Sequence, residues 1–338
     1  MEFNIADAVK TVYRYGSDEK KNKSELHIAY GIDKNFQFGA GISLTSVIIN
    51  NRDVDLVFHL FTDNEDPVFF SALEQLAEKE AIAVNIYLID KSFFTLLPNT
   101  LAWSVAIYYR FIAFEYLAQS LTQVLYLDAD VMCKGSLQAL SEMTLSEGIY
   151  AAVVRDVAET REGAGERLGE AQLKDDYFNS GVMFVSLAAW RDNDIFKRLL
   201  ELLLTSNLKL HFFDQDVLNL LFVRHTLFLS EDYNCIYGIK KELKFRDANK
   251  YKTIIKDSTI LIHYIGVTKP WNSWANYPSA QFFKDAYLQS PWSTQALIGP
   301  RTPKQYKKKS RHERLQGRYG ASIVSYLGYL WAKLKQKS

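Results

Sequence analysis

Short hydrophobic runs alternate with longer amphipathic stretches in the first part of the chain. The short runs are rich in β-branched and aromatic residues and are too brief for buried helices. They predict strands over residues 25–32, 54–61, 84–89 and 123–128. The longer stretches have the residue types or apolar spacing of helices, predicted over residues 38–51, 67–81 and 104–118. This alternation predicts an α/β fold with a largely parallel sheet.

The pattern continues towards the C-terminus with less regular spacing. Further strands are predicted over residues 149–154, 180–187 and 259–265, and further helices over residues 194–204 and 214–222. A polar segment, residues 155–176, separates two of these strands and is predicted to form a helix or a long loop over one face. Long connections of this kind often carry functional residues.

The fourth predicted strand runs directly into two aspartates, Asp128 and Asp130. Residues two apart on a strand share a face, and ligands of open α/β sheets bind beyond the carboxyl ends of the strands. Facing carboxylates repel each other unless a proton or cation lies between them, and Mg²⁺ or Mn²⁺ prefers such ligands. The common alternative to a cation site is that one aspartate caps the following turn and the other is exposed to solvent. The apolar strand before the pair, and the small residues Ala129 and Gly135, favour the cation site.

Phosphatases of the haloacid-dehalogenase type also place an Asp-x-Asp pair after an apolar strand. Their pattern has Thr or Val two residues after the second aspartate, where this chain has Met132. The pair also lies far from the N-terminus. We therefore disfavour a phosphatase.

Three other polar clusters lie beside apolar runs. Asn179 and Ser180 begin a predicted strand, where Gly181 allows close approach of the backbone. The helix at residues 214–222 opens with Asp-Gln-Asp, although its first aspartate is equally suited to cap the helix. His263 lies in a β-rich run that is followed by a Gly, a Lys and a Trp. A lone histidine of this kind is more often a satisfied core residue, so no cluster identifies the protein singly.

Together, the motifs resemble those of family 8 retaining glycosyltransferases, and among them the bacterial lipopolysaccharide core hexosyltransferases. In order, they are "AYGIDKNF", "LYLDAD", "YFNSGV", "DQD" and "HYIGVTKPW". The resemblance implies a GT-A fold, in which a Rossmann-like, mainly parallel sheet flanked by helices binds a nucleotide sugar. It implies an N-terminal extension (1–23), a catalytic domain (24–275) and a small, mostly helical C-terminal region (276–338).

The resemblance also implies roles for residues that match the family's motifs. The ligands of the metal, Mn²⁺ or Mg²⁺, are Asp128, Asp130 and His263. The UDP-sugar donor is bound by three groups of residues. The uridine contacts Asp33, Asn35 and Phe36. The diphosphate and its metal contact Gly266, Lys269 and Asp128, and the sugar contacts Arg110. The residues around the transferred hexose, where Arg110 also acts, are Asn179, Asp214 and Gln215. Phe36 stands where the family often has Tyr, which keeps the stacking but loses a hydroxyl.

Family 8 enzymes retain the anomeric configuration of the sugar. A retaining glycosidase uses a carboxylate nucleophile, whereas the matching position here holds Gln215, a poor nucleophile. We therefore expect same-face attack through an ion-pair-like transition state. In it the departing UDP oxygen takes the acceptor's proton, Gln215 stabilises positive charge on the sugar, and the metal neutralises charge on UDP. Asp214 as a transient nucleophile is the alternative.

Fewer residues of the sequence indicate where the acceptor binds. Asp156 matches an acceptor-contacting position in relatives, and the polar segment that follows it is a candidate lid. Trp271, Trp274 and Tyr277 offer flat faces on which sugars can stack. Packing of the C-terminal region is an equally good explanation of these aromatic residues.

The charge of the chain is unevenly distributed. Residues 301–338 contain eleven Lys or Arg and one acid, a formal charge of +10, so the remainder carries −9 of the total of +1. The apolar stretch 321–334 is too short and broken to span a bilayer, but beside basic residues it suits a helix lying in an anionic membrane interface. A solvated, partly disordered tail is the alternative. Nothing else in the chain supports binding of nucleic acid.

The remaining composition favours a reducing compartment. Two cysteines form no disulfide framework, the first residues lack the apolar segment of a signal peptide, and no apolar run reaches the roughly 20 residues of a membrane helix. We expect a cytoplasmic protein that associates peripherally with the inner membrane.

The resemblance thus implies a metal-dependent retaining transferase that moves glucose from UDP-glucose onto the outer core of lipopolysaccharide, in an α-1,2 linkage. UDP-galactose is the alternative donor, because the two sugars differ only in the orientation of one hydroxyl. A non-catalytic nucleotide-sugar-binding protein is the alternative from another class. Such a protein would not need Gln215 or the Asp-x-Asp pair.

Overall fold

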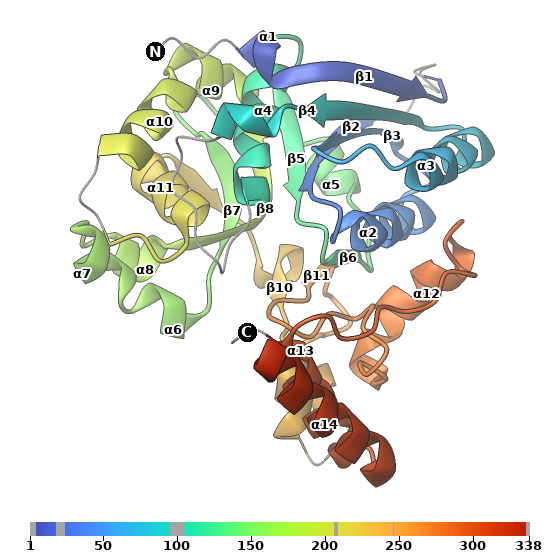
Figure 1. Cartoon of the computed structure of the whole chain (residues 1–338). Helices are drawn as coiled ribbons and strands as arrows, with labels where there is room; N and C mark the ends of the chain where they lie inside the picture. Colours follow the sequence, from blue (N-terminus) through green and yellow to red (C-terminus); the bar gives the residue numbers. More distant parts are fainter. Residues whose placement is uncertain (1–4, 18–23, 95–104, 206–208, 246, 336–338) are drawn as a thin grey trace.

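The computed structural model describes residues 5–17, 24–94, 105–205, 209–245 and 247–335. An eight-stranded sheet, in the order β1-β4-β3-β2-β5-β8-β7-β9, forms its centre (Figure 1). Its strands are β1 (Val9–Tyr15), β2 (Glu25–Ile32), β3 (Asp55–Thr62), β4 (Ala83–Ile89), β5 (Gln123–Leu127), β7 (Ala151–Arg155), β8 (Phe178–Ser186) and β9 (Thr226–Phe228). The neighbours β4, β3, β2 and β5 are parallel, whereas β1 and β8 run antiparallel to their neighbours. The predicted α/β fold is confirmed, and its sheet is mixed.

Helices cover both faces of this sheet. They are α1 (Ile5–Ala8), α2 (Gln37–Asn50), α3 (Pro67–Glu80), α4 (Tyr109–Leu117), α5 (Gln138–Ser141), α9 (Leu187–Asp192), α10 (Ile195–Thr205), α11 (Phe213–Phe222) and α12 (Gln281–Gln289). Short 3₁₀ turns are Lys91–Phe94, Val105–Tyr108, Glu231–Tyr233, Ile239–Leu243, Lys250–Thr253 and Pro278–Ala280. Helices α2, α3 and α12 enclose one hydrophobic core, and α4, α9, α10 and α11 enclose the other.

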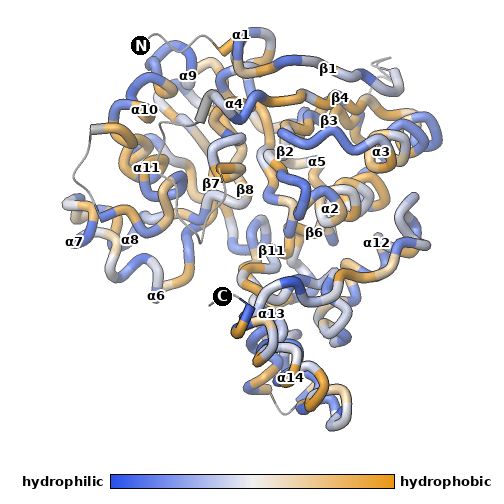
Figure 2. The backbone as a smooth tube through the Cα atoms, in the orientation of Figure 1, coloured by the Kyte–Doolittle hydropathy of each residue, from blue (hydrophilic) through white to orange (hydrophobic). Residues whose placement is uncertain are grey.

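Alternation along the central strands explains the two cores. On β2, Ile28 and Tyr30 point into the first core and Ala29 into the second, because successive side chains of a strand face opposite ways. Both sides of these strands are therefore apolar, and Figure 2 shows hydrophobic residues concentrated in the sheet and the helices against it. Helix α2 has no charged residue and is buried from Gln37 to Ile48, as expected of a helix enclosed on all sides.

A second, three-stranded sheet places the polar motifs close together. Strand β11 (Leu261–His263) lies between β10 (Cys235–Ile236) and β6 (Val131–Cys133). It runs antiparallel to β6, so that His263 pairs with Val131, directly after the Asp-x-Asp pair. The sequence did not reveal β6 or β10, which are only three and two residues long.

The polar segment 155–176 forms three short helices, so it is neither one helix nor a plain loop. They are α6 (Ala158–Arg161), α7 (Ala164–Leu168) and α8 (Leu173–Asp176). A small apolar cluster of Ala164, Leu168, Leu173 and Tyr177 holds them together, packed against Leu220 and Val223 at the end of α11. This segment connects β7 to β8.

The described part of the chain ends in a C-terminal helical hairpin of α13 (Pro303–Leu315) and α14 (Tyr319–Lys335), which projects below the main sheet in Figure 1. The first helix begins with a capping box between Thr302 and Gln305. The described part of the predicted basic tail is thus helical. Within the described ranges, no helix has the length and apolar character needed to cross a membrane.

Candidate active site

Asp128, Asp130 and His263 form the centre of the site. Asp128 follows β5 and Asp130 precedes β6, while His263 is the last residue of β11, the strand that pairs with β6. The ligand atoms of all three residues lie within 4.8 Å of one another. Nε2 of His263 is 3.2 Å from Oδ1 of Asp130 and 3.9 Å from Oδ2 of Asp128. The structure therefore brings together the three residues predicted to bind a metal.

The surroundings of His263 fix which ring nitrogen faces the carboxylates. Its Nδ1 lies 3.1 Å from Oδ1 of Asn179 and 3.2 Å from Oδ1 of Asn234, and both atoms are acceptors. In the neutral ring the proton therefore resides on Nδ1, and Nε2 presents its lone pair to two carboxylates. This donor set fits a divalent cation such as Mn²⁺ or Mg²⁺, and the carbonyl partners are the kind of outer contact that orients a metal-binding histidine.

Gly181 makes room for this cluster. A Cβ atom at this position would lie 2.2 Å from Cε1 of His263 and 2.9 Å from Oδ2 of Asp128, so any larger residue would displace a ligand. The expected close approach at Gly181 is present, and it is made by the side chains of the predicted metal ligands.

Lys269 supplies a positive charge beside the pair. Its Nζ donates to Oδ2 of Asp130 and, over 2.9 Å, to the carbonyl oxygen of Tyr264. Burial alone would raise the pKa of Asp130, but Lys269 and His263 outweigh it and hold that pKa below its ordinary value. Asp130 is therefore an ionised, buried carboxylate with the ammonium group of Lys269 as its counter-charge.

Arg110 connects the aspartate pair to helix α11. Its guanidinium lies 2.8 Å from Oδ1 of Asp128 and 3.2 Å from Oδ2 of Asp214, donates to the carbonyl oxygen of Ser180, and stacks over the ring of Tyr126. Arg110 is 5% exposed, which excludes a surface charge. Its Nε is poorly aligned with Asp214 and is a buried donor without a hydrogen-bond partner among the described residues.

Gln215 lies at the centre of a second polar cluster. Its Nε2 donates to Oδ2 of Asp156 (3.0 Å) and to the hydroxyl of Tyr177 (3.1 Å), and its Oε1 accepts from the backbone N–H of Ser180 (3.0 Å). Asp156 also accepts from Nδ2 of Asn179 over 3.2 Å. The structure thus places Asp156, predicted to contact the acceptor, directly against the residues predicted to surround the hexose.

Asp214 is buried in the first turn of α11. Burial raises the pKa of its carboxyl group, and the charge of Arg110 opposes this shift. The carboxyl group is therefore held in an ion pair inside the site.

The residues predicted to hold the uridine lie in the turn between β2 and α2. Oδ1 of Asp33 accepts from the backbone N–H of Asn35, whose own Oδ1 accepts from Arg301 over 2.9 Å. Strand β2 is the parallel neighbour of β5, so this turn lies at the same edge of the sheet as Asp128. Gly266, three residues after β11, is exposed and has a φ of +92°, a conformation that favours glycine.

The two tryptophans of the acceptor prediction are packed inside the protein, whereas Tyr277 is half-buried. Trp271 is 3% exposed and lies against Phe36 and Phe283, and Trp274 is 0% exposed and donates to Oγ1 of Thr268 over 3.4 Å. Neither indole offers a free face for stacking a sugar. Their burial favours the packing explanation that the sequence left open.

The site also includes four residues for which the sequence predicts no role, namely Asn234, Tyr177, Arg167 and Asp216. Asn234 contacts His263 from the residue before β10, and the other three connect to Gln215. No local motif marks Asn234 or Arg167, because their partners lie 29 and 49 residues away. Asp216 was visible only as the last member of the Asp-Gln-Asp motif.

The mixed sheet, with its Asp-x-Asp pair and histidine at one edge, has the GT-A fold, as a comparison with solved structures shows. The apo structure of the bifunctional glycosyltransferase WbbM matches with a TM-score of 0.67 and 18% identity, over 83% of this chain and 52% of that chain. The galactosyltransferase LgtC in complex with donor and acceptor sugar analogs matches with a TM-score of 0.65 and 24% identity, over 78% of this chain and 96% of that one.

The chain belongs to glycosyl transferase family 8, whose family model matches residues 27–275, and the model of the family 8 C-terminal region matches residues 277–333. It is therefore an enzyme of the hexosyltransferase class. It is 40% identical to a lipopolysaccharide 1,2-glucosyltransferase of Escherichia coli (strain K12), over 94% of each chain. It is 36% identical to a lipopolysaccharide 1,3-galactosyltransferase of Salmonella typhimurium (strain LT2), over 97% of each.

Proposed function

We propose that the protein transfers glucose from UDP-glucose to the outer core of lipopolysaccharide, forming an α-1,2 linkage with retention of configuration and with help from a divalent cation. The observation that carries this proposal is the convergence of Asp128, Asp130 and His263 beside Arg110 and Gln215. Similarity over nearly the full length to a 1,2-glucosyltransferase supports glucose as the sugar. The similarity to a 1,3-galactosyltransferase keeps UDP-galactose as the alternative donor.

Asp128, Asp130 and His263 would hold Mn²⁺ or Mg²⁺. When bound, this cation supplies positive charge that stabilises the departing diphosphate. Lys269, which contacts Asp130, would add a compact counter-charge at the same diphosphate, beside the exposed backbone of Gly266.

The uridine would bind at Asp33, Asn35 and Phe36, in the turn beyond β2. The sugar would bind towards Arg110, whose buried Nε lacks a hydrogen-bond acceptor within the described chain. A buried donor of this kind needs a partner, and a sugar hydroxyl can supply one. Asn179 and Asp156 lie beside Gln215 and would contact the transferred hexose or the incoming acceptor.

The arrangement favours same-face attack over a covalent intermediate. The side chain in the centre of the second cluster is the amide of Gln215, which is a poor nucleophile but has a carbonyl oxygen able to stabilise positive charge on the sugar. Asp214, the alternative nucleophile, is held by Arg110. In the favoured mechanism, the oxygen of the leaving UDP takes the proton of the acceptor hydroxyl.

The C-terminal hairpin would attach the enzyme to the cytoplasmic face of the inner membrane. Helix α14 exposes a row of large apolar side chains: Tyr319, Ile323, Val324, Tyr326, Leu327, Leu330, Trp331 and Leu334. Basic side chains lie over its aromatic rings, with Nζ of Lys335 at 3.8 Å from the ring of Trp331. An apolar face bordered by lysines is typical of helices that lie in an anionic membrane interface.

The test is a transfer reaction with purified protein, Mn²⁺ and core-truncated lipopolysaccharide, with UDP-glucose and UDP-galactose in separate reactions. We expect acceptor-dependent transfer from UDP-glucose, and an α-1,2-linked product by NMR. Transfer from UDP-galactose alone would establish the alternative donor. A β-linked product would exclude retention. Binding of UDP without transfer to any core acceptor would favour the non-catalytic alternative.

A further inference from the structure

A chain of buried hydrogen bonds connects helix α7 to the amide of Gln215. Arg167 of α7 forms a bidentate ion pair with Asp216, with N–O distances of 2.6 and 2.8 Å. Asp216 follows Gln215 in the chain and is 0% exposed. The hydroxyl of Tyr177 donates to Oδ1 of Asp216 over 2.6 Å and accepts from Nε2 of Gln215 over 3.1 Å. Each member of this chain thus bonds to the next.

Asp216 determines the direction of the Tyr177 hydroxyl. Besides Arg167 and Tyr177, the backbone N–H groups of His211 and Phe212 donate to Asp216, over 2.7 and 3.1 Å. A carboxylate surrounded by donors acts only as an acceptor. The single hydroxyl proton of Tyr177 therefore points to Asp216, and the hydroxyl oxygen presents a lone pair to Gln215.

Together with Asp156 and Ser180, this lone pair admits only one orientation of the Gln215 amide. The NH₂ end bonds to the Tyr177 oxygen and to the Asp156 carboxylate, both acceptors, and the Oε1 end accepts from the backbone N–H of Ser180. A reversed amide would place its oxygen against two acceptors and its NH₂ group against an N–H donor. All three contacts would then become repulsive.

We propose that Arg167, Asp216 and Tyr177 are positioning residues that lock the Gln215 amide with its oxygen towards Ser180. The inference rests on the proposed function, in which Gln215 stabilises positive charge on the transferred sugar. Only the carbonyl end of the amide carries the partial negative charge for that task, and a fixed dipole needs no reorganisation during the reaction. The segment 155–176 therefore contributes to catalysis through Arg167 of α7.

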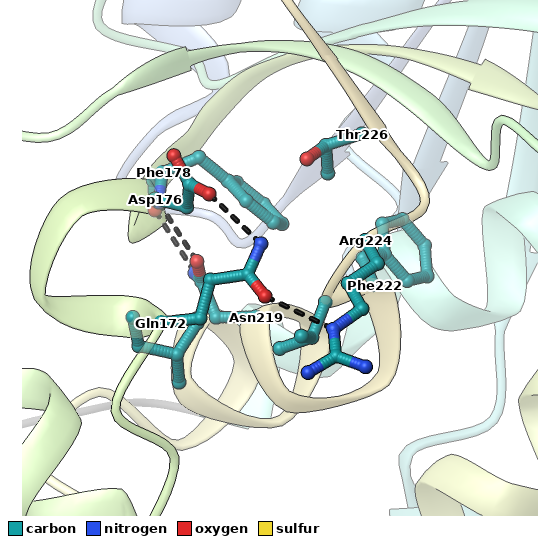
Figure 3. A pocket seen from close by; sticks show the side chains of 9 residues that line it. Gln172, Asp176, Phe178, Asn219, Phe222, Arg224 and Thr226 are labelled. Carbon is teal, nitrogen blue, oxygen red and sulfur yellow. Dashed lines mark hydrogen bonds between the residues drawn. The ribbon is translucent and has the colours of Figure 1, made fainter.

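The same segment has a second attachment, which provides a matched control. Figure 3 shows Gln172, which accepts from Nε of Arg224 over 3.1 Å and donates to Oδ2 of Asp176 over 3.0 Å. These residues border a cavity of about 10 Å³, room for about one water molecule. Neither bond of Gln172 reaches the Gln215 side chain. Gln172→Ala therefore loosens the segment and leaves intact the hydrogen-bonded chain of Arg167, Asp216 and Tyr177, which is called the relay below.

The kinetic test compares Tyr177→Phe in two backgrounds. In the otherwise natural enzyme we expect kcat to fall about tenfold, equivalent to about 1.4 kcal/mol, with the donor KM within about twofold. In the Gln215→Ala background the same change should have no further effect, because a positioning residue acts only through its target. The proposal would be overturned if Tyr177→Phe lowered kcat equally in both backgrounds. It would also be overturned if Gln172→Ala lowered kcat as much as Tyr177→Phe does.

Arg167→Met tests the outer end of the relay without removing a group that contacts Gln215. We expect a smaller fall in kcat, also absent in the Gln215→Ala background, with the folded state verified by thermal unfolding. An Arg167→Met enzyme with unchanged kcat would remove Arg167 from the relay.

A spectroscopic measurement separates failure of the relay from failure of the proposed function. In protein labelled with ¹⁵N-glutamine, the side-chain amide signal of Gln215 is identified by its absence in Gln215→Ala. We expect this amide to be rigid in the natural chain and in Gln172→Ala, and mobile in Tyr177→Phe. Rigidity that survives Tyr177→Phe would overturn the relay. If the Gln215 amide were rigid in a protein that transfers no sugar, the proposed function would be refuted and the relay would not.

Discussion

Replacing Gly181 by alanine is expected to destroy the metal site by steric displacement of His263. The added Cβ would lie 2.2 Å from Cε1 of the imidazole, whereas real contacts are essentially never below 3.0 Å, so the ring and the backbone must separate by at least the difference of 0.8 Å. Metal–ligand distances tolerate only about 0.2 Å. The shift would also disrupt the contacts of Nδ1 with Asn179 and Asn234.

We expect the affinity for Mn²⁺ to fall at least about tenfold, which is the effect of disturbing the outer contacts of a metal ligand. Overpacking should also lower the free energy of unfolding by about 1–3 kcal/mol. Titration calorimetry with Mn²⁺ measures the first effect and urea unfolding the second.

Gly163→Ala is the matched control, because a Cβ at this exposed position meets no atom within 4 Å. It should bind Mn²⁺ as the natural chain does. If Gly181→Ala also bound Mn²⁺ with unchanged affinity, His263 would not be a metal ligand in this arrangement.

Three further perturbations test other parts of the molecule. Gln215→Ala should lower kcat at least about a hundredfold and leave UDP affinity nearly unchanged, because the amide would act on the transition state; an unchanged kcat in the transfer assay would remove Gln215 from the mechanism. Burial, and to a lesser extent His27, lowers the pKa of His59 from 6.5 to about 3. Below pH 6.5 the unfolded chain therefore binds a proton that the folded protein excludes, and between pH 6.5 and 5 this should cost about 2 kcal/mol of stability. Urea unfolding at both pH values should show a smaller loss for His59→Gln, and equal losses would contradict the assignment. On α14, Leu327→Ser should weaken co-sedimentation with anionic vesicles about tenfold, as expected for one partly buried leucine. Leu288→Ser on α12, which is equally exposed at 59%, should have no effect, and equal behaviour of the two variants would refute attachment through α14.

The core strands and the motif residues could be predicted from the sequence because their signals are local. Strands β2 to β5 are short apolar runs, and the Asp-x-Asp pair falls where such a run ends. Parallel pairing of β2 with β5 then brings the turn of Asp33 to the edge that holds Asp128. The edge strand β1 was missed, and residues 9–15 were assigned to an N-terminal extension. No residue of β1 is fully buried, and Lys10, Thr11 and Arg14 are exposed, which makes its apolar signal weak.

Features that depend on long-range packing could not be predicted. The burial of Trp274 depends on the C-terminal hairpin, where Gln316 donates to its carbonyl oxygen. The contact of Asn234 with His263 depends on the pairing of β10 with β11, two strands too short to leave a pattern. The ion pair of Arg167 with Asp216 joins two segments 49 residues apart, and each charge alone resembles an ordinary surface residue.

The most direct test of metal-dependent transfer is UDP release from UDP-glucose in the presence of Mn²⁺, with and without core-truncated lipopolysaccharide. It should be measured for the natural chain and for Asp130→Ala. We expect release that depends on the acceptor and is lost in Asp130→Ala, because this carboxylate would hold the cation beside the diphosphate. Equal release by the two proteins, or release that persists after Mn²⁺ is chelated, would contradict a catalytic role for the Asp128, Asp130 and His263 cluster.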